Sequence, residues 1–226
     1  MKPFSFLLFL AGIMPSCLFA QVAAPEFHLW GIGLLHHTSA TEHFSRDSLL
    51  PHLIGMPTYA NAQGESTGVF EELDILEADL REYAYGTEGL IFLEEKNGYL
   101  RVLYRTTKGG LWLSREDLQQ RGWEMEKWMD FFLHFSPTLF PRALGVNMNL
   151  RTMPFAHSKR LTTMTDDAFF IRLTGKTNGL WAEVEVQEWE GTYCEDQGKL
   201  QNEWTGWVKL LDDRGYPNLW FYTRGC

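Results

Sequence analysis

Apolar and polar residues alternate with a period of two in two stretches of the chain, and each stretch is interrupted by a turn. The first runs from Ile91 as IFLEEKNGYLRVLY and turns at Lys96–Gly98. The second runs from Phe169 as FFIRLTGKTNGLWAEVEV and turns at Asn178–Gly179. Strands that bury one face show this alternation, and Asn or Gly turns join such strands into hairpins. The pattern predicts a mainly β protein.

The two stretches also resemble each other. NGYLRVLY and GLWAEVEV align without a gap, which pairs Tyr99 with Trp181, Val102 with Val184 and Tyr104 with Val186. Each run is followed by a glycine–tryptophan segment, GGLW at Gly109–Trp112 and TGWV at Thr205–Val208. A repeat of this kind predicts a diverged internal duplication.

Two segments depart from the β pattern. Ser114 and Asp117 form a capping box that opens a helix, which Gly122 is expected to interrupt. Apolar residues then recur on one helical face, which predicts a helix over Glu124–Phe135 that packs between the two copies; an alternative is that this face meets a partner. The face consists of Met125, Trp128, Phe132 and Phe135. The earlier stretch Glu71–Gly86 is expected to be an inserted helix or a long loop.

The N-terminus has the three parts of a secretory signal peptide. Residues 1–20 carry one Lys, an apolar run from Phe4 to Met14, and small residues leading to Ala20. We expect export to the periplasm or the extracellular space, cleavage near Ala20, and no stable membrane span in the mature chain. A retained anchor and lipid attachment at Cys17 are the alternatives.

The net charge limits which classes of partner the chain can bind, and the cysteine content bears on the disulfides of an exported chain. The formal net charge of −9 argues against nucleic acid or anionic lipid as a partner. Once Cys17 leaves with the signal peptide, two cysteines remain in an exported chain, which predicts a disulfide between Cys194 and Cys226. The alternative is a catalytic thiol, for which neither TYCED nor RGC has a nucleophile motif.

Residues 146–226 contain a series of spaced positions, which are, in order, Asn149, Leu150, Arg151, Pro154, Ser158, the turn Asn178–Gly179, Trp181, Val184, and Gly206, Trp207 and Val208. In the order and spacing of several of these parts, the segment resembles the bacterial SH3-like family. Residues from about 53 to 118 resemble the same family more loosely and lack the N-L-R segment. The C-terminal copy departs from the pattern through an insertion before its last tryptophan strand and a tail after it.

The resemblance implies two SH3-like small β-barrels joined by a helical connector. The expected divisions are residues 21–118, the connector 119–145, and residues 146–226 with the tail. Arg151 is expected to find an acidic partner on a neighbouring strand, because a charge beside core residues needs one.

The function implied is a non-catalytic binding or scaffold protein of the cell envelope, which recognises a cell-wall peptide or a protein partner. The expected ligand-binding residues are Tyr99, Trp112, Trp181 and Trp207. A structural accessory subunit and a hydrolase with its site between the domains are the alternatives. No hydrolase, phosphate-binding or dinucleotide motif occurs in the sequence, and neither a cofactor nor a metal is expected. His36, His37 and His43 lack the spacing of a metal site.

Overall fold

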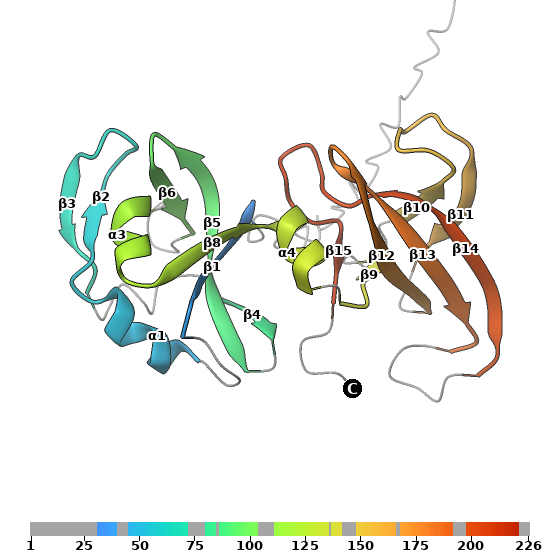
Figure 1. The fold of residues 1–226 in the computed structure, drawn as a ribbon, viewed down its shortest axis with the longest axis horizontal. Helices are drawn as coiled ribbons and strands as arrows, with labels where there is room; N and C mark the ends of the chain where they lie inside the picture. The colour runs from blue at the N-terminus through green and yellow to red at the C-terminus, as the bar shows by residue number, and fades with distance from the viewer. Residues whose placement is uncertain are drawn as a thin grey trace, which may run out of the picture.

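The computed structural model describes residues 31–39, 45–71, 80–84, 86–103, 111–135, 137–141, 148–165, 168–191 and 198–221. The predicted mainly β class is confirmed, because strands dominate these ranges and the helices are short. Two large antiparallel sheets lie at opposite ends of the molecule, with helix α4 between them (Figure 1). Signal residues 1–20, Cys17, His43, Cys194 and Cys226 lie outside the described ranges, as does Tyr104.

The N-terminal half contains the eight-stranded sheet, in the order β3-β2-β7-β6-β5-β1-β8, with β4 paired beside β5. Asn97 and Gly98 both have positive φ, as a tight two-residue turn between β5 and β6 requires. The elements are β1 (Gly33–His37), α1 (Arg46–Leu53), β2 (Pro57–Tyr59), β3 (Ser66–Val69), β4 (Leu80–Ala84), β5 (Thr87–Lys96), β6 (Tyr99–Val102), β7 (Leu111–Ser114), α3 (Arg115–Gln120) and β8 (Trp123–Lys127).

The C-terminal half contains a five-stranded sheet in the order β11-β10-β14-β13-β12, and a two-stranded sheet of β15 and β9. An isolated bridge between Leu139 and Ile171 connects the residue before β9 to β12. The elements are α4 (Trp128–Phe135), β9 (Phe140–Pro141), β10 (Met148–Arg151), β11 (Arg160–Met164), β12 (Phe169–Asn178), β13 (Trp181–Trp189), β14 (Leu200–Lys209) and β15 (Leu219–Trp220).

The two halves share one strand order. The path β8-β1-β5-β6-β7-β2-β3 corresponds to β15-β9-β12-β13-β14-β10-β11, with the Leu139 bridge standing for the pairing of β1 with β5. The registers agree as well. Arg101 lies opposite Trp112 and Glu183 opposite Trp207, while Tyr59 lies opposite Trp112 and Arg151 opposite Trp207. The alignment of Tyr99 with Trp181 and of Val102 with Val184 therefore holds residue by residue.

Strands β1 and β5 have buried side chains on both faces of the first sheet. Leu35, Leu90 and Phe92 belong to a core within the N-terminal half, under α1 and α3. Leu34 and Ile91 point the other way and belong to a core shared with α4 and the second sheet. A strand covered on both sides needs a continuous apolar run, which explains the run Leu90–Phe92.

Helix α4 fills the junction between the halves. Trp128 and Phe132 are fully buried, and Phe131 is nearly so. Their rings pack against Trp220 and Phe221 at the end of the described chain, with Trp128 and Trp220 5.1 Å apart between ring centroids. The indole N–H of Trp128 donates a hydrogen bond of 3.1 Å to the carbonyl of Gly31. The expectation that this helix packs between the copies is met by these contacts.

The predicted extent of that helix was wrong at its start. Residues 123–127 form strand β8, which pairs with β1 from Gly33↔Lys127 to His37↔Trp123. Trp123 and Met125 alternate with Glu124 and Glu126, so this short segment has the period of a strand. Helix α4 begins only at Trp128, and Met125 packs against the N-terminal core instead of the helix face.

Two other expectations have definite outcomes. Ser114 caps α3 as predicted, because its Oγ accepts a 3.3 Å hydrogen bond from the Asp117 amide, and Gly122, at φ +81°, follows the end of that helix. The stretch Glu71–Gly86 was expected to be a helix or loop, but Leu80–Ala84 is strand β4; residues 72–79 lie outside the described ranges.

Within the described ranges neither large sheet closes on itself, since no pairing joins β3 to β8 or β11 to β12.

Candidate functional site

The four predicted ligand-binding residues lie in two places. Residues that alternate with the buried Leu100, Val102 and Leu113 point away from the core of the first sheet, and among them are Tyr99 and Trp112. Trp181 and Trp207 hold the equivalent positions on the second sheet. We call these two surfaces the first and the second outer face. The structure therefore groups the four rings in pairs, one pair in each half.

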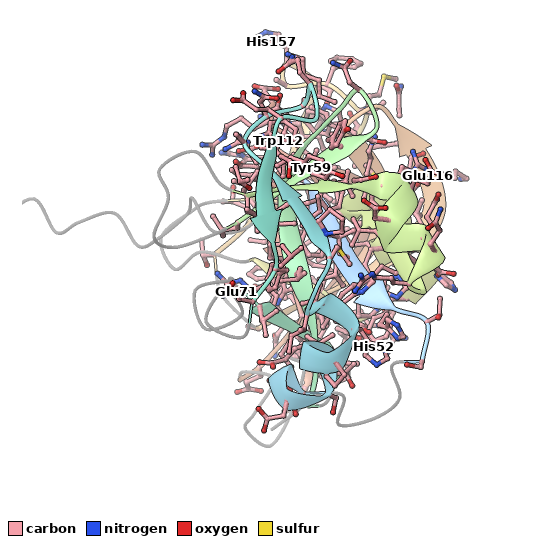
Figure 2. All side chains as sticks on the ribbon, turned by 90° about the vertical axis from the view of Figure 1, so that its left-hand side faces the viewer. His52, Tyr59, Glu71, Trp112, Glu116 and His157 are labelled. Carbon is pink, nitrogen blue, oxygen red and sulfur yellow. The ribbon has the colours of Figure 1, made fainter. Side chains whose placement is uncertain are left out.

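The first outer face is largely occupied by its own side chains. Trp112 is only 8% exposed, and Tyr59, which the sequence analysis missed, lies opposite it on β2. Figure 2 shows Tyr59 and Trp112 side by side at this end of the molecule. The rings of Tyr59 and Tyr99 meet edge to face at 5.0 Å. The loop after β2 packs so closely on the Tyr99 hydroxyl that any side chain at Gly64 would overlap it.

Tyr59 also connects this face to helix α3. Its hydroxyl donates a hydrogen bond of 3.4 Å to the carboxylate of Asp117. Burial, and then the charge of Asp117, raise the pKa of Tyr59, so the ring remains a neutral donor at physiological pH. These contacts hold β2, its loop and α3 together, and they leave little aromatic surface for a ligand.

The second outer face is more open. Trp181 and Trp207 are both half-buried and lie diagonally on β13 and β14, because Trp181 pairs with Lys209 and Trp207 with Glu183. Diagonal neighbours on an antiparallel pair are within reach of each other when the side chains are large. Arg151 takes the place that Tyr59 has in the first half, opposite Trp207. Two half-buried rings thus lie on this face, and Arg151 stands where the first half has the aromatic Tyr59.

Among the described residues no acidic side chain pairs with Arg151, although the sequence predicted one. Its Nη1 donates a 2.7 Å hydrogen bond to the carbonyl of Ser158, across the loop between β10 and β11. A main-chain carbonyl therefore satisfies part of the guanidinium. Arg151 thus stabilises the loop between β10 and β11. Glu183, which lies in the same row of the sheet, pairs with Lys176.

Further along the second outer face the surface is hollowed into a pocket of about 380 Å³. Acidic and amide groups dominate its polar lining, with one arginine. It is lined by Phe170, Arg172, Glu185, Val186, Gln187, Glu203, Trp204 and Thr205. The Gln187 side chain donates to Glu203 at 2.6 Å, which holds one carboxylate in place.

Beside the tryptophans, Glu183 is kept ionised. Lys176 lies 2.8 Å from it and Thr174 donates to it at 2.9 Å. The hydrogen bond from Lys176, and then that from Thr174, hold the pKa of Glu183 below its usual range. The face therefore offers two aromatic rings followed by fixed negative charge. The alternation of Glu183 and Glu185 with buried valines, on the strand of Trp181, was the sequence signal that could have found this row.

Two other hollows lie in or next to the N-terminal half. One of about 430 Å³ lies beside α3 and is lined by residues that include Leu35, Leu118, Gln119 and Trp123. The other, of about 300 Å³, lies next to α4 and contains His36, Glu126 and His134. The Glu126 carboxylate lies between the two imidazoles: Oε2 is 3.8 Å from His36 Nε2, and Oε1 is 3.3 Å from His134 Nδ1.

The histidines of the sequence cluster have separate surroundings. His37 is buried, accepts a hydrogen bond from the Ser39 amide at Nδ1, and lies with Nε2 2.9 Å from the Arg121 carbonyl. These contacts favour the tautomer that carries a proton on Nε2, from which the Arg121 carbonyl accepts a hydrogen bond. Among the described residues, no group of three or more His, Cys, Asp and Glu side chains is placed to hold a metal ion.

In the part of the chain that the structure describes, no helix has the length and apolar character needed to cross a membrane. Protein-family models, curated proteins and solved structures show no match to this chain.

Proposed function

We propose that this chain is a non-catalytic binding or scaffold protein of the cell envelope, built from two SH3-like small barrels, whose second outer face binds an extended peptide. The barrel assignment draws support from the order β8-β1-β5-β6-β7 followed by the β2–β3 hairpin, which recurs in the C-terminal half. Small sheets of this kind bind extended chains on shallow aromatic surfaces.

One observation carries the proposal: Trp207 is half-buried, whereas Trp112 at the equivalent position is only 8% exposed. Trp181 is half-buried as well, and on the first outer face the ring of Tyr59 packs against the equivalent Tyr99. A half-buried tryptophan on a strand supplies apolar contact area to a ligand at low entropy cost. The duplicated framework holds both tryptophans on paired strands, so a ligand does not have to order them. This favours the second half over the first as the binding half.

The charges beside the rings indicate the ligand class. Glu183, Glu185 and Glu203 follow the tryptophans along the second outer face, against Arg172 and Lys176. A peptide that carries a free amino group fits this arrangement, because the amine meets carboxylates while its apolar part covers the rings. Cell-wall peptides with amine side chains belong to this class.

Co-sedimentation with purified peptidoglycan tests the proposal. We expect the full chain to be retained, and Trp181→Ala and Trp207→Ala each to weaken retention by about 2 kcal/mol, roughly thirtyfold, as central aromatic contacts do. Tyr99→Ala is the matched control at the position equivalent to Trp181, and it should bind as the wild type does. Circular dichroism establishes that each variant is folded.

Two results would overturn the proposal. The first is a wild-type chain that is not retained on peptidoglycan; if a single envelope protein co-purified instead, the chain would be a structural accessory subunit. The second is retention that depends on Tyr99 and not on the two tryptophans, which would move the site to the first half.

A further inference from the structure

The loop between β10 and β11 presents two large apolar side chains to solvent. Met153 is 54% exposed and Phe155 49% exposed, and they are two of the five large apolar residues that are exposed in the described ranges. Single exposed apolar residues are ordinary on a protein surface. Two of them, separated only by Pro154 in one loop, are a local feature that packing within the chain does not explain.

The loop holds this shape through its own hydrogen bonds. The Thr152 amide donates to the Lys159 carbonyl at 3.0 Å, and the Ser158 amide to the Phe155 carbonyl at 3.1 Å. Ser158 Oγ, in a residue only 8% exposed, lies 2.9 Å from the carbonyl oxygens of both Met153 and Phe155. Together with Arg151 on the Ser158 carbonyl, these bonds fix the two apolar residues in outward positions.

Positive charge surrounds the apolar pair. Lys159 and Arg160 are exposed at the end of the loop, and His157 is exposed within it. Residues 148–165 contain three Arg and Lys residues and no Asp or Glu, in a chain whose formal net charge is −9. In Figure 2, His157 lies at the extreme upper end of the molecule, so a flat surface can approach this loop.

The equivalent loop of the N-terminal half has neither property. It runs over residues 60–65, with Ala62 buried and Asn61 bonding to Glu65 at 2.9 Å. It is two residues shorter between paired positions, since Tyr59 pairs with Ser66 but Arg151 pairs with Arg160. The apolar pair and its cations are therefore additions of the second copy and are not required by the framework.

We propose that the loop 152–159, with Arg160, docks the protein on an anionic phospholipid surface. Met153 and Phe155 enter the interfacial layer while Lys159 and Arg160 remain at the level of the phosphate headgroups, as long cationic side chains do. A projecting tip with two apolar side chains suits a deformable surface, whereas a protein partner would need a matching hollow. The net charge of the chain suggested that anionic lipid would be excluded, but at physiological salt charges act over only about 8 Å, so the local cations decide.

Vesicle co-sedimentation with the full chain tests this inference. We expect binding to vesicles of equimolar phosphatidylglycerol and phosphatidylcholine, weaker binding at high salt, and little binding to pure phosphatidylcholine. The double variant Met153→Ser, Phe155→Ser should lose at least tenfold in affinity. The double variant Lys159→Gln, Arg160→Gln should lose roughly fivefold for each cation removed.

Ile54→Ser, Val69→Ser is the matched control, because these residues are exposed to a similar degree elsewhere on the surface. It should bind vesicles as the wild type does. Three results would overturn the inference: no binding to anionic vesicles at low salt, unchanged binding by the Met153→Ser, Phe155→Ser variant, or equal binding to neutral vesicles. Peptidoglycan retention is measured on different residues, so the two proposals fail separately.

Discussion

Equivalent positions in the two halves carry different side chains, and these differences decide which outer face is open. Tyr59 and Arg151 lie opposite equivalent tryptophans, but the Tyr59 ring covers its neighbours while Arg151 is directed to the Ser158 carbonyl. Glu183 likewise replaces Arg101. The sequence predicted that Trp112 and Trp207 hold equivalent positions, but it could not reveal Tyr59, because that contact comes from a strand some fifty residues away.

Two adjacent imidazoles are expected to make the N-terminal half sensitive to acid. The rings of His37 and His52 lie 3.8 Å apart between centroids. Burial, and then the proximity of His37, lower the pKa of His52. The unfolded chain therefore binds the proton more readily than the folded protein does. The contribution of His52 to stability is complete above its ordinary pKa of about 6.5 and is lost as the pH falls through the lower folded value.

We expect His52→Phe, which keeps a stacking ring but cannot titrate, to reduce the loss of stability between about pH 7 and pH 5. The free energy of unfolding from urea denaturation, measured at several pH values for both proteins, checks this. Parallel curves for the variant and the wild type would show that His52 has no part in the acid sensitivity.

At the level of elements, local alternation predicted the strands that pair with their sequence neighbours. The β5–β6 and β12–β13 hairpins follow the period-two runs and their glycine turns. Strands β1 and β8 pair with each other across the chain, and β8 has only five residues, so Met125 and Trp128 could be read with helical spacing. Pairing with β1 makes this segment a strand instead of a helix, and the local sequence pattern does not reveal which strand it pairs with.

Two phenylalanines on the aromatic face of α4 differ in exposure, so their replacement tests how much burial at the junction contributes to stability. Phe132 is fully buried between the halves, whereas Phe135, one turn later, is 47% exposed although its ring lies 5.3 Å from that of Phe131. Phe132→Ala should lower the free energy of unfolding by about 3–5 kcal/mol, because it leaves a cavity in a packed core. Phe135→Ala should cost less than about 1 kcal/mol.

Urea denaturation of both variants and the wild type measures this difference. The helical circular dichroism of α4 is too small a signal to be useful, so tryptophan fluorescence is the better probe, since Trp128 and Trp220 lie in the same cluster. Equal losses for the two phenylalanines would contradict the proposed role of Phe132 as the centre of the junction.

Over the whole molecule, one core crosses from the first sheet to the second. Leu34 and Ile91 of the N-terminal half belong to the same buried cluster as α4 and the strands of the C-terminal half. Neither half can open without exposing part of that cluster. We therefore expect one cooperative unfolding transition for the whole chain, with the calorimetric and van't Hoff enthalpies in agreement. Scanning calorimetry checks this, and two resolved transitions in the wild type would show that the halves are energetically independent.

The duplication was the part of the architecture that could be predicted from sequence, because NGYLRVLY and GLWAEVEV preserve the alternation on either side of equivalent turns. The outer strands of each path were not predictable in the same way. Pairing of β15 with β9 and of β8 with β1 depends on contacts between distant, short segments. For the candidate site, the sequence indicated which strands carry the rings, but not that Tyr59 packs on the first outer face.

No residue separates Lys127, the last of β8, from Trp128, the first of α4. The two halves are therefore joined without a tether, and their spacing is set by packed side chains. A change in the angle between the two large sheets would require the rings of Trp128, Phe132 and Trp220 to repack. We therefore expect the two halves to move as one body.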